Sequence, residues 1–311
     1  MMYQTMAAAG GPVFLLVLLG YVLAWRNIMD LSAQRALNRL AMWVLMPGSL
    51  MYLLSHERLA EIFDPALWGA FYGAIAIVAV VAVAVLRLAF RCSLPETAVL
   101  MMASTFSNLV LLGFPIVEGA YGRPGLTILL IVVSIHAAVL VTLTVLMAEW
   151  GLSGGGGWKA LRKTLSGVVR NPVLIGIAAG VALSLTGLRL PAVLDQALER
   201  MQGAVTPLSL LLVGSGLYGV KLRGDLRVSL FLAGAKTLLL PLLVFLLGRF
   251  VFGLPPFTVT VCTVIACMPT GANTTLMAGT YRLGENRVAS SILIGTAISL
   301  LVAPVLIAVL A

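Results

Sequence analysis

Apolar runs of about 20 residues recur along almost the whole of this 311-residue chain. A helix of about 20 apolar residues spans the hydrocarbon core of a bilayer, which is about 30 Å thick. Hydrophobic residues make up 61% of the chain and charged residues only 10%, whereas a soluble domain has about 45 to 50% apolar and about 25% charged residues. A soluble fold of this size could not bury so much apolar surface. The sequence therefore predicts an all-α integral membrane protein.

The apolar runs divide into ten predicted transmembrane helices, with five on each side of a hydrophilic stretch. The ten ranges are 7–25, 36–54, 66–90, 95–121, 125–149, 168–187, 203–220, 228–250, 256–281 and 285–310. The hydrophilic stretch, 150–167, contains four consecutive glycines at 154–157. Its composition is typical of a flexible linker. We therefore predict two five-helix halves, 1–149 and 168–311, joined by a cytoplasmic linker.

Basic residues concentrate in alternate loops between the predicted helices. With the helices threaded in order, fourteen Lys and Arg fall on one side of the membrane and five on the other. Cytoplasmic loops carry an excess of Lys and Arg, so both termini should be extracytoplasmic in a protein of the cytoplasmic membrane. The net charge of +9 suits anionic lipid headgroups rather than nucleic acid, because the basic residues lie in short loops between apolar runs.

The two halves are related by an internal repeat. A shift of 160 residues aligns three pairs of prolines without a gap: Pro12 with Pro172, Pro47 with Pro207 and Pro95 with Pro255. Chance predicts roughly 0.3 proline matches at such a shift, so the agreement indicates a duplicated unit. Each half holds an odd number of helices, and the second half must therefore enter the membrane upside down. Inverted repeats of this kind are typical of secondary transporters, whose substrate site lies near the midplane.

Residues that interrupt helices lie inside the fourth and ninth predicted helices. Proline removes a backbone donor, and nearby glycine lets the backbone open. Two broken helices that cross at the midplane would direct free N–H groups and partial positive charge at an anion. The alternative is a simple kink in each helix, with the two asparagines bonding neighbouring helices. The candidate substrate-binding residues are Ser107, Asn108, Gly113, Pro115, Pro269, Gly271, Asn273 and Thr274.

The run from Asn108 through Pro115 to Gly119 and Tyr121 resembles the fourth-helix motif of the auxin efflux carrier family, which includes the plant PIN-formed carriers and many bacterial permeases. A second set of residues resembles the ninth and tenth helices of that family: Pro269, Gly271, Ala278, Tyr281, Ser291 and Pro304.

This resemblance implies that helices 4 and 9 break and cross. It also implies that helices 1, 2, 6 and 7 form a scaffold while helices 3–5 and 8–10 carry the substrate in an elevator motion. Asn108 would then contact the substrate, and Pro115 would mark the first crossing. The plant carriers have a second proline where Thr274 stands, so the second break is expected either at Pro269 or near Thr274.

Three further polar residues lie inside predicted helices. Lys236 is expensive to bury in a bilayer, and it either attracts the anion directly or neutralises the carbonyl ends of the broken helices. His136 is either a proton relay or a hydrogen-bonded packing residue. Glu118 lies within one turn of a helix end, and it either reaches the membrane interface or partners a coupling proton.

Catalytic, metal and cofactor chemistry finds little support in the sequence. An intramembrane enzyme needs a nucleophile beside a base, or a pair of deep carboxylates. The Gly214–Ser215–Gly216 motif is equally explained by close helix packing. Cys92, Cys262 and Cys267 lack the spacing of a metal or disulfide site. We therefore predict no catalytic residues, no metal and no cofactor.

The sequence thus predicts a permease for a small organic anion such as a carboxylate, with the bilayer and the substrate as its partners. A sodium-coupled symporter of the bile-acid type is the alternative, since its fold is related. An anion channel is a third and weaker alternative, because broken helices also line pores. A homodimer through the scaffold helices is left open.

Overall fold

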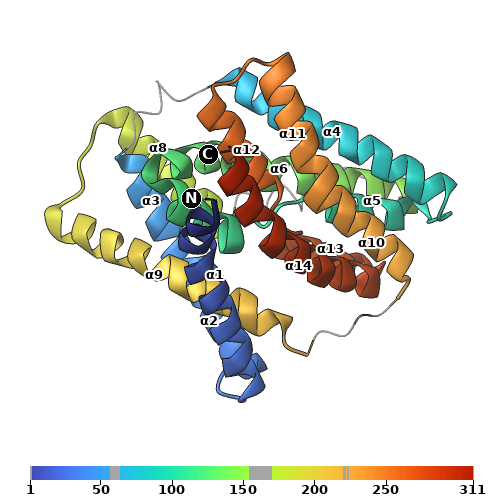
Figure 1. Cartoon of the computed structure of the whole chain (residues 1–311), viewed down its shortest axis with the longest axis horizontal. Helices are drawn as coiled ribbons and strands as arrows, with labels where there is room; N and C mark the ends of the chain where they lie inside the picture. Colours follow the sequence, from blue (N-terminus) through green and yellow to red (C-terminus); the bar gives the residue numbers. More distant parts are fainter. Residues whose placement is uncertain (1, 57–63, 154–169, 220–221, 223, 311) are drawn as a thin grey trace. The chain divides into compact units, whose positions relative to one another are not determined.

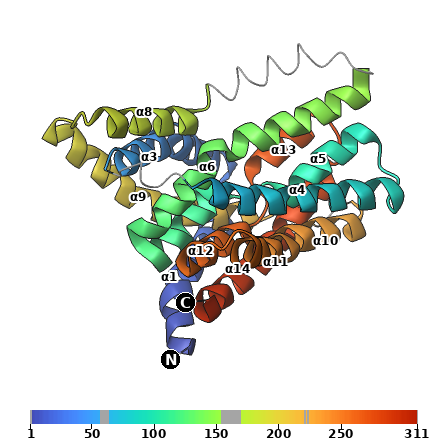
Figure 2. The same ribbon diagram turned by 90° about the horizontal axis from the view of Figure 1, so that it is seen from above.

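The structure is a computed structural model that describes residues 2–56, 64–153, 170–219, 222 and 224–310. Every regular element in these ranges is helical, and Figures 1 and 2 give two views of them. The α-helices are α1 (Met2–Trp25), α2 (Leu31–Leu40), α3 (Met46–Ser55), α4 (Pro65–Leu88), α5 (Leu94–Thr105), α6 (Phe114–Ser153), α8 (Pro172–Thr186), α9 (Ala192–Leu217), α10 (Leu226–Gly234), α11 (Leu240–Leu246), α12 (Pro256–Ala266), α13 (Ala272–Tyr281) and α14 (Glu285–Leu310).

Among the described residues, four short π-helical segments connect or extend these helices: η1 (Ala41–Leu45), η3 (Leu109–Gly113), η4 (Ala235–Leu239) and η5 (Leu247–Val251). Three of them immediately precede a helix with proline in its first turn, since Pro47 follows η1, Pro115 follows η3 and Pro241 follows η4. A proline lacks the N–H that an α-helix needs and its ring crowds the preceding turn. A π turn widens the helix at this point, so the chain continues past the proline instead of ending there.

Helix starts follow the capping chemistry of the sequence. The side chain of Ser93 caps α5 by accepting from the Glu96 amide, and Asn171 caps α8 by accepting from the Val173 amide. Such side chains satisfy N–H groups that have no partner inside the helix. At the other end of α8, Gly187 adopts a left-handed conformation with φ 66°, which stops the helix.

All ten predicted ranges contain helix in the described residues, although several boundaries differ. Helix α9 begins at Ala192 and not at 203, because its first turns are polar and hydropathy alone does not detect them. The predicted gap between 121 and 125 is a single non-helical residue inside α6, Gly122, with φ 58° and ψ −151°. Of the linker predicted at 150–167, residues 150–153 end α6, and the remainder lies outside the described residues.

Four helical stretches in the described ranges are long and apolar enough to cross a bilayer: Pro65–Leu88, Leu109–Leu152, Leu226–Val251 and Glu285–Leu310. Shorter apolar helices cover Gly11–Trp25, Pro172–Thr186 and Pro256–Ala266. An all-helical chain with several such stretches is a multi-pass membrane protein, because only the bilayer accommodates this many apolar helical surfaces.

The chain divides into two compact units. Unit 1 comprises Met1–Asp64, Val110–Ser134 and Val168–Gly219, and unit 2 comprises Pro65–Leu109, Ile135–Gly167 and Val220–Ala311. Unit 1 therefore contains α1, α2, α3, α8 and α9. Unit 2 contains α4, α5 and α10 to α14. Helix α6 begins in unit 1 and ends in unit 2.

Glycines allow two pairs of helices in unit 1 to pack at backbone distance. A Cβ on Gly20 of α1 would collide with the Leu211 carbonyl of α9, and a Cβ on Gly214 of α9 would collide with the Val17 carbonyl of α1. Helices α3 and α8 meet in the same way, because a Cβ on Gly180 would lie 2.9 Å from the Met51 oxygen. Small residues are the usual means of close helix approach in membranes.

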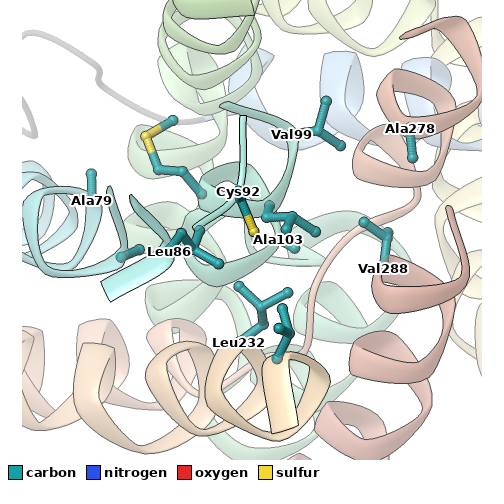
Figure 3. Packing of buried hydrophobic residues seen from close by; sticks show 12 residues of the cluster. Ala79, Leu86, Cys92, Val99, Ala103, Leu232, Ala278 and Val288 are labelled. Atoms are coloured by element: carbon teal, nitrogen blue, oxygen red, sulfur yellow. The ribbon is translucent and has the colours of Figure 1, made fainter. Parts of the chain in front are cut away.

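Unit 2 has a continuous apolar core in which α4, α5, α10, α13 and α14 meet (Figure 3). Helices α10 and α14 lie side by side in this unit (Figure 2). Residues fully buried there include Ala82, Leu86, Val99, Leu232 and Val288. The core holds together helices that are distant in sequence.

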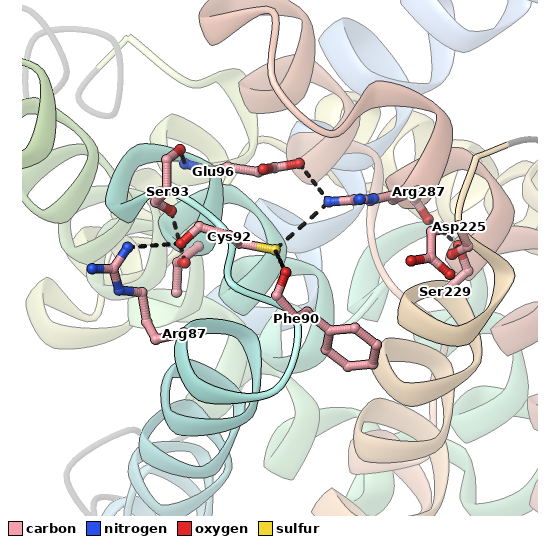
Figure 4. A network of polar contacts seen from close by, with 9 residues as sticks. Arg87, Phe90, Cys92, Ser93, Glu96, Asp225, Ser229 and Arg287 are labelled. Atoms are coloured by element: carbon pink, nitrogen blue, oxygen red, sulfur yellow. Dashed lines mark hydrogen bonds and ion pairs between the residues drawn. The ribbon is translucent and has the colours of Figure 1, made fainter.

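A polar network joins the α4–α5 turn to α14 in unit 2 (Figure 4). The Arg287 Nη1 atom lies 2.8 Å from Glu96 Oε1 and 3.6 Å from Cys92 Sγ. Arg87 donates to the Cys92 carbonyl at 2.7 Å. Burial, followed by the neighbouring Glu96 charge, raises the pKa of the Cys92 thiol. The thiol therefore stays neutral beside the ion pair.

Candidate functional site

The fourth and ninth predicted helices are both interrupted, and the two interruptions pair with each other in unit 2. Helix α5 ends at Thr105, and helix α12 ends at Ala266. Ser107 and Thr270 then form an isolated antiparallel bridge. We name the segments 106–109 and 267–272 the crossing. Backbone polar groups of the two segments bond to each other instead of remaining open, as non-helical backbone at membrane depth requires.

Two backbone hydrogen bonds hold the crossing. The Asn108 amide donates to the Pro269 carbonyl at 2.7 Å, and the Gly271 amide donates to the Phe106 carbonyl at 3.1 Å. The second break therefore includes Pro269, whereas Thr274 is helical within α13. Gly271 must be small because a Cβ on it would lie 2.8 Å from the Phe106 ring.

Pro115, which the family resemblance would place at the first crossing, lies outside the paired segments. The bridge is formed at Ser107, whereas Pro115 is the second residue of α6 and follows the π segment η3. Proline is well tolerated in the first turn of a helix, where its missing N–H has no partner to lose. The interruption begins where Phe106 leaves helical geometry with ψ 111°.

Side chains satisfy the carbonyl ends of both interrupted helices. At the end of α12 the fully buried Lys236 donates from Nζ to the Ala266 carbonyl at 2.6 Å. Near the end of α5 the Thr270 hydroxyl donates to the Ala103 carbonyl at 2.5 Å. The carboxyl end of a helix carries partial negative charge, so a lysine there is favourably placed. This contact favours the neutralising role of Lys236 over direct attraction of substrate.

His136 holds the first interruption in place. Its Nε2 atom accepts a hydrogen bond from the Ser107 amide at 3.0 Å, and its ring lies against Phe106, Phe71 and Tyr72 with centroids 4.8, 6.2 and 6.2 Å away. An imidazole nitrogen that accepts a bond carries no proton, so the proton is on Nδ1 and the ring is neutral. His136 therefore lies in the position expected of a hydrogen-bonded packing residue.

The amino end of α13 lies at the crossing. Helix α13 begins after Gly271, whose N-cap position has no side chain to accept from the first amides. The hydroxyls of Ser107 and Thr274 are buried and have no hydrogen-bond partner among the described residues. Asn108 within the crossing and Asn273 in the first turn of α13 are partly exposed. A helix amino end with nearby hydroxyl and amide groups can bind a carboxylate or phosphate.

Three predicted site residues belong to unit 1 and are not part of the crossing: Gly113, Pro115 and Glu118. The Glu118 carboxylate accepts a short hydrogen bond from the Thr206 hydroxyl and another from Gln202 Nε2 at 3.1 Å. Glu118 therefore ties its segment to α9 within unit 1. Its interfacial and proton-coupling roles both remain predictions.

Thr270, Gln202 and Thr206 were not predicted from the sequence. A threonine between Pro269 and Gly271 could have been detected as part of the break, because it lies in the same Pro-Thr-Gly run. Gln202 and Thr206 lie 84 and 88 residues from Glu118. They carry no local signal, since only tertiary packing brings them to that carboxylate.

The whole chain is similar to known membrane transport proteins. The family model described as "Membrane transport protein" matches residues 8–154 and 157–307. An "Uncharacterized transporter" of Methanothermobacter thermautotrophicus is 26% identical over 301 residues, which cover 94% of each chain. Both matches cover the two predicted halves.

Proposed function

The chain belongs to the membrane transport protein family, which is the auxin efflux carrier family, and on this premise we propose that it carries a small organic anion through the membrane at the crossing. The family and the archaeal relative are transporters and not enzymes. The substrate class we propose is a carboxylate. The site would be formed by Ser107, Asn108, Asn273 and Thr274.

The paired interruption of α5 and α12 is the observation that carries this proposal. Lys236 and Thr270 compensate the negative carbonyl ends, while the amino end of α13 has no side-chain cap. The carbonyl ends are therefore compensated by side chains, whereas the partial positive charge at the amino end of α13 is not. An anion that enters the crossing would supply that partner. Its carboxylate oxygens could accept from the buried Ser107 and Thr274 hydroxyls, which otherwise lack partners among the described residues.

We propose an elevator mechanism in which unit 2 moves and unit 1 stays fixed. The crossing residues, Lys236 and His136 all belong to unit 2, so they could move together without breaking their mutual bonds. The glycine-packed pairs α1 with α9 and α3 with α8 all belong to unit 1, which suits a rigid scaffold. The family resemblance supports the same division, except that Val110–Ser134 is grouped with unit 1.

We also propose the membrane arrangement predicted from the sequence. It consists of ten transmembrane helices in two inverted repeats, with both termini outside the cytoplasmic membrane. The 160-residue proline repeat and the distribution of Lys and Arg support it. The paired interruptions of the fourth and ninth predicted helices are consistent with equivalent positions in two repeats.

A sodium-coupled symporter of the bile-acid type is a second candidate. The observation in its favour is that two buried hydroxyls, Ser107 Oγ and Thr274 Oγ1, have free lone pairs, since hydroxyl and carbonyl oxygens bind hard cations. Uptake that requires a sodium gradient would select this alternative. Uptake that is independent of sodium would instead favour an anion carrier that is uncoupled or coupled to protons.

Transport into proteoliposomes tests the proposed function. Purified protein should accumulate or exchange a radiolabelled mono- or dicarboxylate with saturable kinetics. Asn108→Ala and Asn273→Ala should each weaken binding by about tenfold or more, because a hydrogen bond to a charged group contributes about 1.5 to 3 kcal/mol. Asn38→Ala, which makes the same change in the exposed helix α2, is the matched control.

Unchanged transport in Asn108→Ala and Asn273→Ala would indicate that these side chains only pack against neighbouring helices and do not bind substrate. Ohmic single-channel currents would favour a pore over a carrier. Absence of any carboxylate uptake, with folded protein in the vesicles, would contradict the proposed substrate class.

A further inference from the structure

A basic and aromatic surface lies at the turn between α1 and α2 in unit 1. We name it the basic corner. It consists of exposed residues on one turn and one helix face: Trp25, Arg26, Ile28, Leu31, Arg35 and Arg39. Trp25 is 57% exposed, and Ile28 and Leu31 are each 68% exposed. Large apolar side chains and arginines are thus presented together.

The opposite side of the basic corner is fixed against α9. Met29 and Ala41 are buried with Leu212, and the partly buried Leu37 and Leu208 pack against them. The Gln34 side chain donates to the Met29 carbonyl at 3.0 Å, which secures the turn. The exposed side of α2 is therefore held in one orientation and is not a fluctuating end of the chain.

The arginines of the basic corner have no acidic partner in the part of the chain that the structure describes. Within the described ranges, Arg26, Arg35 and Arg39 form no ion pair. The acid between them, Asp30, caps α2 by accepting from the Ala33 amide at 2.7 Å and from the Ser32 hydroxyl at 2.8 Å. The bond from the Ala33 amide lowers the pKa of this carboxyl. Asp30 therefore acts as the N-cap of α2 and does not pair with the arginines.

The spacing of the three α2 residues directs them to one face of the helix. Leu31, Arg35 and Arg39 follow one another at intervals of four residues, so they share one face of α2. The Arg26 guanidinium lies 5.0 Å above the Trp25 ring centroid. Tryptophan and arginine together are characteristic of the boundary between headgroups and acyl chains, where the ring and the charge are both satisfied.

We propose that the basic corner is a binding site for the headgroup of an anionic phospholipid. Its three guanidinium groups would bind the phosphate and any further acidic group. The exposed Trp25, Ile28 and Leu31 side chains would meet the upper part of the acyl chains. A zwitterionic lipid fits less well, because its ammonium group would lie among three positive charges.

Quenching of Trp25 fluorescence by brominated lipid tests this inference. The reporter protein carries Phe at the other four tryptophans, Trp43, Trp68, Trp150 and Trp158, and gel filtration and melting temperature check its fold. It is reconstituted in mixed phosphatidylcholine and phosphatidylglycerol bilayers of one composition. Bromine is placed on the acyl chains of either the anionic or the zwitterionic lipid. Quenching by brominated phosphatidylglycerol should exceed its share of the bilayer several-fold.

Charge variants test whether the three arginines cause the preference of the corner for phosphatidylglycerol. Replacing Arg26, Arg35 and Arg39 by Gln should abolish the excess quenching, since each basic residue at an anionic surface contributes a factor of about five. The three changes to Lys should retain it. A control triple variant, Arg189→Gln, Arg200→Gln and Arg249→Gln, removes the same charge from exposed sites elsewhere and should leave the preference intact. High salt should reduce it.

Three results would overturn the proposal. One is that the Gln triple variant keeps the excess quenching by brominated phosphatidylglycerol. Another is that the control triple variant loses this excess to the same extent. The third is shielding of Trp25 from both brominated lipids, which would mean that protein, such as a second copy of the chain, covers the corner.

Discussion

His136 Nε2 accepts the backbone N–H of Ser107 at 3.0 Å, across 29 residues of sequence. The bond satisfies one of the amides that the interruption of α5 leaves without a helical partner. Because an acceptor nitrogen must be unprotonated, the position of the imidazole and its neutral state are linked to the geometry of the break. Both properties can be tested by substitution.

His136→Phe should destabilise the protein by about 1 to 3 kcal/mol, because it leaves the buried Ser107 amide without an acceptor. The ring would still pack against Phe106 and Phe71. His136→Gln offers a side-chain oxygen in place of Nε2 and should recover part of the loss. Thermal unfolding in detergent measures both variants. A Phe variant as stable as the parent would show that the bond does not hold the break.

Lys236→Met should lower the melting temperature of the protein without substrate. The Met chain still fills the site, but the Ala266 carbonyl at the end of α12 loses its donor, and a hydrogen bond from a charged group contributes about 1.5 to 3 kcal/mol. We expect anion affinity to fall as well, through the disturbed crossing. Arg200→Met at an exposed position is the control. Loss of affinity in a variant that keeps full thermal stability would instead assign Lys236 to direct substrate attraction.

Gly271→Ala should abolish transport. The added methyl group would lie 2.8 Å from the Phe106 ring, which forces apart the two backbone segments of the bridge. The second change Phe106→Ala removes the obstructing ring and should restore part of the activity. Gly279→Ala, inside the helix α13 that follows Gly271, meets nothing within 4 Å and should be neutral or slightly stabilising. Equal uptake by the Gly271 and Gly279 variants would disprove the steric argument.

Gly214→Ala should prevent close packing of α9 on α1, because its Cβ would collide with the Val17 carbonyl. We expect lower yield and a lower melting temperature, as for overpacked interfaces that cost about 1 to 3 kcal/mol. The neighbouring Gly216 has nothing within 4 Å of an added Cβ, so Gly216→Ala is a control two residues away. A matching effect of the two changes would point to helix propensity and not to interhelical contact.

Cysteine labelling tests the membrane orientation. Leu152 at the end of α6 is 59% exposed, and Leu188 between α8 and α9 is 66% exposed. With both termini outside, a cysteine at Leu152 should react only with reagent on the cytoplasmic side and a cysteine at Leu188 only with reagent outside. The native cysteines, Cys92, Cys262 and Cys267, are buried and should give little background. The reverse labelling pattern would invert the proposed topology.

Hydropathy and proline spacing were sufficient to predict where most helices lie. The break near Pro269 and Gly271 was predictable, because proline and glycine act on the local backbone wherever they occur. The polar start of α9 at Ala192 was missed because its first turns resemble a loop in hydropathy. The π segments were also missed, since an extra residue in a helical turn leaves an apolar run unchanged.

Partners across long sequence separations could not be predicted. Thr270 bonds to Ala103, 167 residues away, and Lys236 bonds to Ala266, 30 residues away. The sequence indicated that Lys236 needed a partner inside the membrane, because an isolated charge there is costly. It did not indicate which partner, since a carbonyl at the end of any neighbouring helix would satisfy the same requirement.

The acceptor of Lys236 is a carbonyl and not a carboxylate, which has an electrical consequence. A protonated lysine bonded to a neutral group keeps its whole charge, so an elevator that moves unit 2 would also move that charge through the membrane field. Each elementary charge that crosses the full field changes the free energy by about 2.3 kcal/mol per 100 mV. A bound monoanion would cancel the lysine charge. The loaded step would then be nearly insensitive to voltage, and the empty return would set the dependence of transport rate on membrane potential.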